Sequence, residues 1–318
     1  MKKKNNKKVE LLAPAGGVEQ FIAAVENGAD AIYLGGRSFN ARMKAGNFDD
    51  AMLVKAVDFA HKRGVDVHVA MNILLRDDEL RDALEYATFL YETGVDALIV
   101  QDLGLASLIY KNLPDFPLHL STQGTVHSLD GVKAAERMGF RRVVLSRELS
   151  CEEIKFICAN TETEIETFVH GAICICYSGQ CQLSRAFGGR SGNRGECAQP
   201  CRLRYNSFDE DVRLMEKGSH ALSPKDLSLI DHLGKLVEAG VASLKIEGRM
   251  KSPEYVGVVV GIYRKYLDEY YRNGYYEVSA RDRNALEQIF NRGGFTDQYF
   301  KGNSDDRLMS KNIPKHNG

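Results

Sequence analysis

The sequence lacks several features that would assign it to a common functional class. Its 42 lysine and arginine residues nearly match its 43 aspartate and glutamate residues, so the formal net charge is −1 at pH 7. No global positive field therefore favours nucleic acid, although a local basic patch stays compatible with it. No run of 18 apolar residues occurs, and the N-terminus is rich in lysine rather than apolar. We therefore expect a cytoplasmic protein without a membrane-spanning segment.

Familiar catalytic motifs are also missing. The chain contains neither the HExxH motif of zinc proteases nor the GxSxG nucleophile elbow, which weakens a protease interpretation. No GxGxxG fingerprint follows the first predicted strand, which argues against a dinucleotide-binding fold. The C-x3-C-x2-C arrangement of radical-SAM enzymes is absent as well. The function must be sought in other patterns.

The first of these patterns is a repeat. An amphipathic helix pattern ends in glycine and an apolar strand follows, around Gly28, Gly64, Gly94, Gly139 and Gly240. Each glycine suits a left-handed helix C-cap. Eight strands are predicted, over residues 9–14, 31–35, 65–72, 97–101, 118–123, 142–147, 164–170 and 243–247. Regular strand and helix alternation over eight units predicts a (β/α)8 TIM-type barrel.

The repeat is interrupted between the seventh and eighth strands. This cysteine-rich insertion, residues 171–224, follows the carboxyl end of a strand, which is the face where such barrels carry their active sites. It contains a candidate hairpin over 202–206 and 212–215, and a further helix is predicted near 280–290. The expected organisation is a basic stub (1–8), a barrel with its insertion (9–275), and an extension (276–318) that leads toward a further domain.

Polar residues alternate with apolar ones in the third, fifth, seventh and eighth strands, so they are predicted to face the barrel interior. His68, His119 and Glu166 fall in a lower layer, where mutual pairing of buried polar groups explains them equally well. Asn72, Gln123, His170, Lys245 and Glu247 fall nearer the carboxyl ends, with Arg42 and Arg249 on the adjoining loops. We expect Arg42, Asn72, Gln123 and Arg249 to bind substrate, and His170, Glu247 and Lys245 to be catalytic. His170 and Glu247 are the proton-transfer candidates, because partial burial can bring either group to titrate near neutrality.

Four cysteines lie in the insertion with the spacing C-x6-C-x15-C-x3-C: Cys174, Cys181, Cys197 and Cys201. Thiolates at such spacing are typical ligands of a soft metal or an iron–sulfur cluster. The wide gaps fit a cluster better than tetrahedral zinc, whose ligands usually come as two close pairs, although zinc and free thiols stay open. Cys151 and Cys158 lie on a helix pattern and are predicted to be packed thiols. Arginines and glycines interleave in the same loop, as in a rim that faces an anion or RNA.

Longer blocks carry a resemblance to a known family. The stretch from Glu166 to Ser184, ETFVHGAICICYSGQCQLS, resembles the signature of peptidase family U-32, the collagenase-like peptidases. The blocks LLAPAG, YLGGRSFNAR, STQ, LSRELS, SGNRGECAQPCR, LSPKDL and KIEGRMKSPEYV are also similar to recurrent blocks of that family. The resemblance covers nearly the whole chain.

The resemblance implies more than the family name does. Members are implicated in oxygen-independent or prephenate-dependent hydroxylation of transfer and ribosomal RNA, and others assist ubiquinone hydroxylation. In those relatives the cysteine quartet holds a [4Fe–4S] cluster, and longer members carry a small β-barrel after the catalytic barrel. We therefore expect an iron–sulfur enzyme that hydroxylates a tRNA uridine, with a carboxylate-bearing co-substrate such as prephenate. A collagenase-like peptidase, or a noncatalytic iron–sulfur subunit that works with a paralogous or accessory protein, is the alternative.

Overall fold

The computed structural model describes residues 8–42, 45–303 and 305–310. Eight parallel strands close into a barrel, because β11 pairs with both β1 and β7 and so joins the two ends of the sheet. The barrel strands are β1 (Glu10–Pro14), β2 (Ala31–Leu34), β3 (Asp66–Met71), β4 (Ala97–Val100), β5 (Leu118–Leu120), β6 (Arg142–Val144), β7 (Glu164–Gly171) and β11 (Ser243–Ile246). The predicted (β/α)8 barrel is confirmed, and every predicted strand overlaps an observed one.

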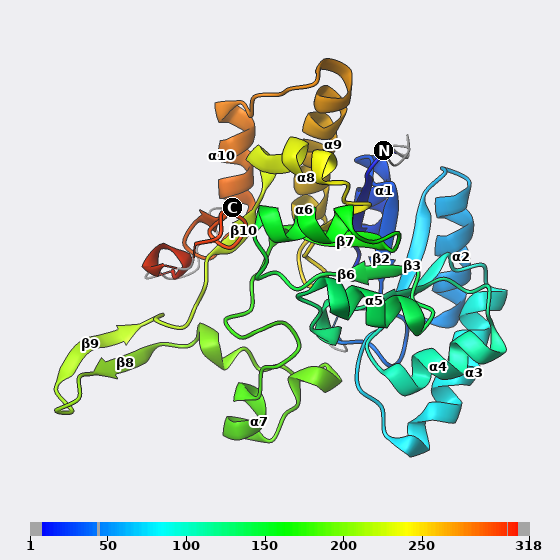
Figure 1. The fold of residues 1–318 in the computed structure, drawn as a ribbon, viewed down its shortest axis with the longest axis horizontal. Helices are drawn as coiled ribbons and strands as arrows, with labels where there is room; N and C mark the ends of the chain where they lie inside the picture. The colour runs from blue at the N-terminus through cyan, green and yellow to red at the C-terminus, as the bar shows by residue number, and fades with distance from the viewer. Residues whose placement is uncertain (1–7, 43–44, 304, 311–318) are drawn as a thin grey trace.

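Helices surround the strands on the outside of the barrel (Figure 1). They are α1 (Val18–Glu26), α2 (Asp50–His61), α3 (Leu80–Glu92), α4 (Leu103–Asn112), α5 (Leu129–Arg137), α6 (Cys151–Ala159), α8 (Leu233–Ala239) and α9 (Pro253–Asn273). Outward strand residues such as Val67, Val69 and Met71 join the helix faces in one large apolar core. Gly240 ends α8 with φ of 88°, a left-handed conformation that glycine adopts without strain. Cys151 and Cys158 pack partly buried against this core, as predicted.

The barrel interior is filled by two kinds of side chain. Leu12, Ala31, Tyr33, Ala70 and Ile99 form a small apolar cluster inside the strands. The layer toward the amino ends of the strands is ionic instead. There the Arg142 guanidinium binds carboxylates from β1 and β7, and Lys245 Nζ lies 2.7 Å from Oε1 of the fully buried Glu166. Glu166 is therefore paired within the interior, but with Arg142 and Lys245 rather than with His68 or His119 as the pairing interpretation expected.

The predicted insertion leaves the carboxyl end of β7. It carries α7 (Leu183–Gly188) and an antiparallel hairpin of β8 (Tyr205–Phe208) and β9 (Leu214–Ser219). The hairpin begins later than the predicted 202–206, because Pro200–Arg202 form a 3-10 turn instead. Figure 1 shows α7 and the hairpin together at the lower left, with the hairpin projecting from the body of the molecule.

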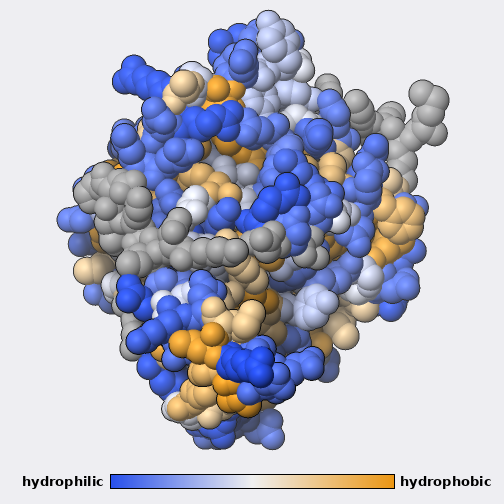
Figure 2. Space-filling view, turned by 90° about the vertical axis from the view of Figure 1, so that its left-hand side faces the viewer, coloured by the Kyte–Doolittle hydropathy of each residue, from blue (hydrophilic) through white to orange (hydrophobic). Residues whose placement is uncertain are grey.

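The hairpin surface is partly apolar. Phe208, Val212, Leu214 and Met215 are all at least half exposed. Figure 2 views the side from which the hairpin projects, and it shows apolar groups gathered low on this face among hydrophilic ones. The barrel body therefore does not cover the hairpin.

Two short strands that sequence reasoning did not predict follow the insertion. β10 (Asp226–Ser228) runs antiparallel to the end of β7, and β12 (Phe295–Thr296) runs parallel to β10. The predicted helix near 280–290 is α10 (Ala280–Ile289), which packs against α9. The described part of the 276–318 extension is thus attached to the barrel. Of the predicted stub 1–8, only Lys8 lies within the described residues.

Candidate active site

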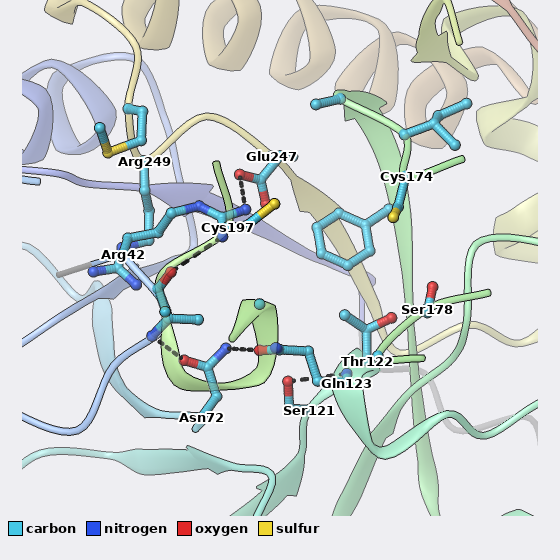
Figure 3. Close-up of a pocket in the computed structure, with 18 of the residues that line it drawn as sticks. Arg42, Asn72, Ser121, Thr122, Gln123, Cys174, Ser178, Cys197, Glu247 and Arg249 are labelled. Carbon is cyan, nitrogen blue, oxygen red and sulfur yellow. Dashed lines mark hydrogen bonds and ion pairs between the residues drawn. The ribbon is translucent and has the colours of Figure 1, made fainter. Parts of the chain in front are cut away.

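A cavity of about 360 Å³ opens at the carboxyl ends of the barrel strands, beneath the insertion. Its walls come from strands β2, β3, β4, β7 and β11, from segments that follow several barrel strands, from the insertion and from the C-terminal extension (Figure 3). Among the described residues, eight basic side chains line it and only one acidic side chain does. The basic ones are Arg42, Arg147, Arg190, Arg202, Lys245, Arg249, Lys251 and Arg292, and the acidic one is Glu247. Such a wall favours a ligand with negative charge.

The predicted cysteine quartet lines this cavity in full. Cys174 follows β7, Cys181 precedes α7, and Cys197 and Cys201 come from the loop before the hairpin. Cys176, two residues from Cys174, does not line the cavity. The sequence prediction that these four thiols share one site therefore agrees with their placement.

The sulfurs are spread more widely than in a formed tetrahedral zinc site. Thiolates on one zinc, at about 2.3 Å from the metal, lie only about 3.8 Å from one another. Within the described residues, no three cysteine sulfurs lie within 4.8 Å of each other. A cubane cluster presents four separate iron corners and takes a wider set of thiolates, so this donor set suits a cluster better than zinc.

Hydrogen bonds fix the loops that carry the cysteines. Ser184 Oγ accepts from the Ala198 amide at 3.0 Å and lies 3.8 Å from Cys197 Sγ. The Arg202 guanidinium donates to the Ile173 carbonyl on one side and to Ser223 and Pro224 on the other. It therefore ties the start of the insertion to its end. Supporting contacts of this kind orient metal ligands in proteins.

The charge around the thiols is mixed. Burial raises the pKa of Cys174 and Cys201, and the neighbouring quartet sulfurs raise both pKa values further. Arg147 lowers the pKa of Cys174, and Arg202 lowers that of Cys201. The two arginines thus favour the thiolate forms that a metal centre needs.

Glu247 supplies the carboxylate in the described part of the wall. Its Oε1 lies 3.4 Å from Arg42 Nη2, and its Oε2 lies 3.9 Å from Arg147 Nη2. Burial acts to raise the pKa of Glu247, but Arg42, Arg147 and Arg249 outweigh it, so the pKa is lowered. Glu247 is therefore ionised at neutral pH. The expectation that it titrates near neutrality is wrong, because three arginines surround it.

Asn72 and Gln123, predicted to bind substrate, bind each other. Asn72 Nδ2 donates to Gln123 Oε1 at 3.1 Å, and Asn72 Oδ1 accepts from the Ala41 amide at 3.0 Å (Figure 3). The pair thereby positions the backbone next to Arg42. Arg249 is almost fully buried, and its Nη2 donates to both Asn40 and Asn47 at 2.9 Å. Asn72, Gln123 and Arg249 therefore line the cavity while their hydrogen bonds brace its rim.

His170 does not reach the cavity. The β7–β11 register shifts between Lys245, which pairs with Phe168, and Ile246, which pairs with His170. The extra residue on β7 reverses the alternation, so Phe168 lines the cavity while His170 packs outside it. Its Nδ1 lies 3.2 Å from the Tyr263 hydroxyl of α9, and burial lowers its pKa to about 3. The predicted position of His170 in the pocket is therefore corrected by this bulge.

Three cationic side chains of the wall were missed from the sequence: Arg147, Lys251 and Arg292. Arg147 ends the predicted sixth strand, so the rule that selected Gln123 could also have found it. Lys251 lies beside the rings of Phe290 and Tyr255, and burial, together with Arg292, lowers its pKa to about 7. Arg292 belongs to the C-terminal extension and pairs with Asp226 at 2.7 Å. No local pattern indicates that it reaches the cavity.

Comparison with known proteins identifies the family of the chain and a solved structure with a similar barrel. The profile of Peptidase family U32 matches residues 16–310, and the chain belongs to this family. A solved structure, "The Structure of the U32 Peptidase Mk0906", aligns with 78% of the chain and 96% of its own length. Its TM-score is 0.51 at 15% sequence identity, which supports the shared barrel fold alone.

Several curated relatives carry names from RNA modification, while one of Porphyromonas gingivalis, 34% identical over 92% of this chain and 73% of that protein, is named "Collagenase". The "23S rRNA 5-hydroxycytidine C2501 synthase" of Escherichia coli is 44% identical over 262 residues, covering 82% of this chain and 39% of that protein. The "tRNA hydroxylation protein P1" of Bacillus subtilis is 41% identical over 270 residues, covering 83% of this chain and 64% of that protein. The matched region thus spans less than two thirds of the length of either of these two relatives.

Proposed function

We propose that the chain is the barrel of an iron–sulfur-dependent enzyme that hydroxylates a base in RNA, with a tRNA uridine as the first candidate. The observation that carries this proposal is the meeting of all four spaced cysteines with eight basic side chains in one cavity. The relatives named for tRNA and rRNA hydroxylation supply the substrate class. A cytoplasmic location stays a prediction, and no helix among the described residues is long and apolar enough to span a membrane.

Cys174, Cys181, Cys197 and Cys201 would hold the cluster. A [4Fe–4S] cluster held by four thiolates would supply one-electron chemistry. The protein residues have separate tasks. Arg202 and Ser184 hold the cysteine loops in place, and Asn72 holds the backbone beside Arg42.

The basic wall suits the second substrate. Arg42, Arg147 and Lys251 face the cavity together with Glu247 and could bind the carboxylates of a co-substrate such as prephenate. Arginine offers paired N–H groups that match a carboxylate, and Lys251 adds a compact charge. Lys251 also replaces His170 as the cavity group that can exchange a proton near neutrality, because its pKa is lowered to about 7.

Peptide hydrolysis has less support. No histidine is among the described residues that line the cavity, so none of the four cysteines there is paired with an imidazole base. A noncatalytic subunit with the same cluster is the other alternative, and it differs from the proposal in needing a partner for any activity. Both alternatives are outcomes of one experiment.

The test is mass spectrometry of nucleosides from a strain that lacks the gene, complemented with wild-type or variant protein. Wild type should restore a hydroxylated nucleoside, and Cys181→Ala should not. Cys158→Ala is the control and should also restore it, because Cys158 lies on α6, outside the cavity. An unchanged nucleoside profile in the deletion strain would overturn the proposal. The subunit alternative is favoured if wild type restores the nucleoside in the cell but the purified protein does not modify isolated RNA in the presence of prephenate. Hydrolysis of gelatin by both wild type and Cys181→Ala would favour the peptidase.

A further inference from the structure

The opposite end of the barrel holds a second group of candidate ligands. Glu10 at the start of β1, Asp66 at the start of β3 and His68 in β3 each place one ligand atom within 4.8 Å of the other two. Among the described residues, no other three histidine, cysteine or acidic side chains approach so closely. These residues lie at the amino ends of the strands, away from the cysteine cavity at the carboxyl ends.

His68 gives an independent sign that a ligand belongs there. Its side chain is buried, with 3% of its surface exposed, and its Nδ1 has no hydrogen-bond partner within the described part of the chain. Its ring instead contacts that of His119 edge-on, with the centroids 4.9 Å apart. A buried imidazole nitrogen without a partner is unfavourable. A cation at the three ligand atoms would be held by one of the two ring nitrogens of His68.

The charge balance points the same way. Glu10, Glu164 and Glu166 share the Arg142 guanidinium, and Glu166 also binds Lys245. Asp66 adds a fourth carboxylate to these three, against the two cationic side chains. The set therefore carries two excess negative charges, which is the charge that one divalent cation balances.

We propose that Glu10, Asp66 and His68 form a site for a divalent transition-metal ion at the floor of the barrel. One imidazole and two carboxylates suit ions such as Zn²⁺ or Mn²⁺. Three ligand atoms about 2.0–2.2 Å from one ion and evenly spaced around it lie at most about 3.8 Å apart, so the side chains would have to close by up to about 1 Å to complete the site. Asp66 is exposed, which leaves the site open to solvent. Bound there, the ion would link β1 to β3 independently of the cluster and of RNA.

Mn²⁺ is the probe of choice, because it prefers oxygen and nitrogen ligands to the thiolates of the cysteine cavity. The experiment is titration of the anaerobically purified, cluster-containing protein, with free Mn²⁺ followed by electron paramagnetic resonance. Wild type should bind about one Mn²⁺ per chain, and added Zn²⁺ should displace it. Asp66→Asn and His68→Ala should each weaken binding by roughly tenfold or more. Asp58→Asn, which alters an exposed carboxylate on α2, should bind like wild type.

Asp66→Asn keeps the shape of an exposed side chain, so it tests the site even if His68→Ala fails to fold. Failure of wild type to bind Mn²⁺ would overturn the proposal. So would equal binding by wild type and Asp66→Asn, or an equal loss in Asp58→Asn, which would indicate general attraction to surface carboxylates. Cys181→Ala should bind Mn²⁺ like wild type, so this result is separate from the fate of the RNA proposal.

Discussion

Arg42 and Glu247 face each other at the mouth of the cavity, with Arg42 Nη2 3.4 Å from Glu247 Oε1. This separation exceeds the roughly 2.7–2.9 Å of an optimal charge-assisted hydrogen bond. Arg147 stands still farther from the same carboxylate, at 3.9 Å. Neither guanidinium is therefore saturated by Glu247, and both keep capacity for an incoming anion.

Opposite changes at this pair should have opposite effects on anion binding. Arg42→Gln removes a cation and should weaken binding of a dicarboxylate such as malonate by about tenfold, or about 1.4 kcal/mol. Glu247→Gln removes the competing carboxylate and should strengthen binding by a similar factor. Isothermal titration calorimetry measures both, with Glu238→Gln on the exposed face of α8 as the control. Weaker binding in Glu247→Gln would contradict the assignment of the wall to anion binding.

The iron content of the protein should depend on the four cysteines that line the cavity and not on the other cysteines. Anaerobically purified wild type should be brown and contain about four iron atoms per chain. Alanine at Cys174, Cys181, Cys197 or Cys201 should lower the iron content sharply. Cys176→Ala is the matched control, because this thiol lies in the same loop but not in the cavity, and it should keep its iron. Colourless wild type with stoichiometric zinc would show the cluster assignment to be wrong.

Lys251 should make anion binding depend on pH. Burial and then the neighbouring Arg292 lower its pKa from 10.5 to about 7. Below pH 7 the side chain is protonated and attracts the dicarboxylate, and above pH 7 it loses that charge. Affinity of wild type should therefore fall as the pH rises from 6 to 8. Lys251→Arg stays charged and should show no such fall, whereas parallel profiles for the two proteins would exclude this role.

His170 should weaken the fold in acid. Burial lowers its pKa from 6.5 to about 3, so the folded state holds it neutral while the unfolded chain protonates it below pH 6.5. The unfolded state then binds more protons, and the free energy of unfolding falls as the pH drops. The loss attributable to His170 should be about 3 kcal/mol between pH 6.5 and 4.

Urea denaturation of wild type and His170→Phe at these two pH values measures that loss. The phenylalanine cannot take up a proton, and the surrounding rings of Tyr255, Tyr263 and Phe295 suit an aromatic side chain. The variant should lose less stability in acid than wild type does. His61→Asn, at an exposed position on α2, should follow wild type, and equal acid losses in all three would contradict the prediction.

Much of the fold could be predicted because it follows from local patterns. Helix, glycine and apolar strand recur at the sequence level, and the closure of eight such units is a property of that repetition. Alternation also placed Lys245 in the barrel interior, because β11 keeps its pairing there. Gln123 lines the cavity too, but from a 3-10 turn that follows β5 rather than from the strand. The shared site of the four cysteines could also be predicted, because a single insertion carries all four.

The errors arise where the outcome depends on partners far along the chain. The bulge that turns His170 away from the cavity is a feature of the β7–β11 pairing, and the sequence of β7 does not predict it. Arg292 reaches the cavity only because β12 joins β10 and α10 packs on α9. The charge state of Glu247 depends on arginines from three different loops. Such features become visible only when the tertiary contacts are known.

The insertion crosses the barrel mouth and is fastened on the far side. Arg194 binds Glu79 at 2.7 Å and the Leu74 carbonyl, and the Asn193 carbonyl accepts from the Leu74 amide. The cavity beneath this bridge measures about 360 Å³, which leaves no room for a stacked duplex. An RNA substrate would have to present its target as a single unstacked nucleotide. Loops and single-stranded ends would then react in preference to paired stems, whatever their base sequence.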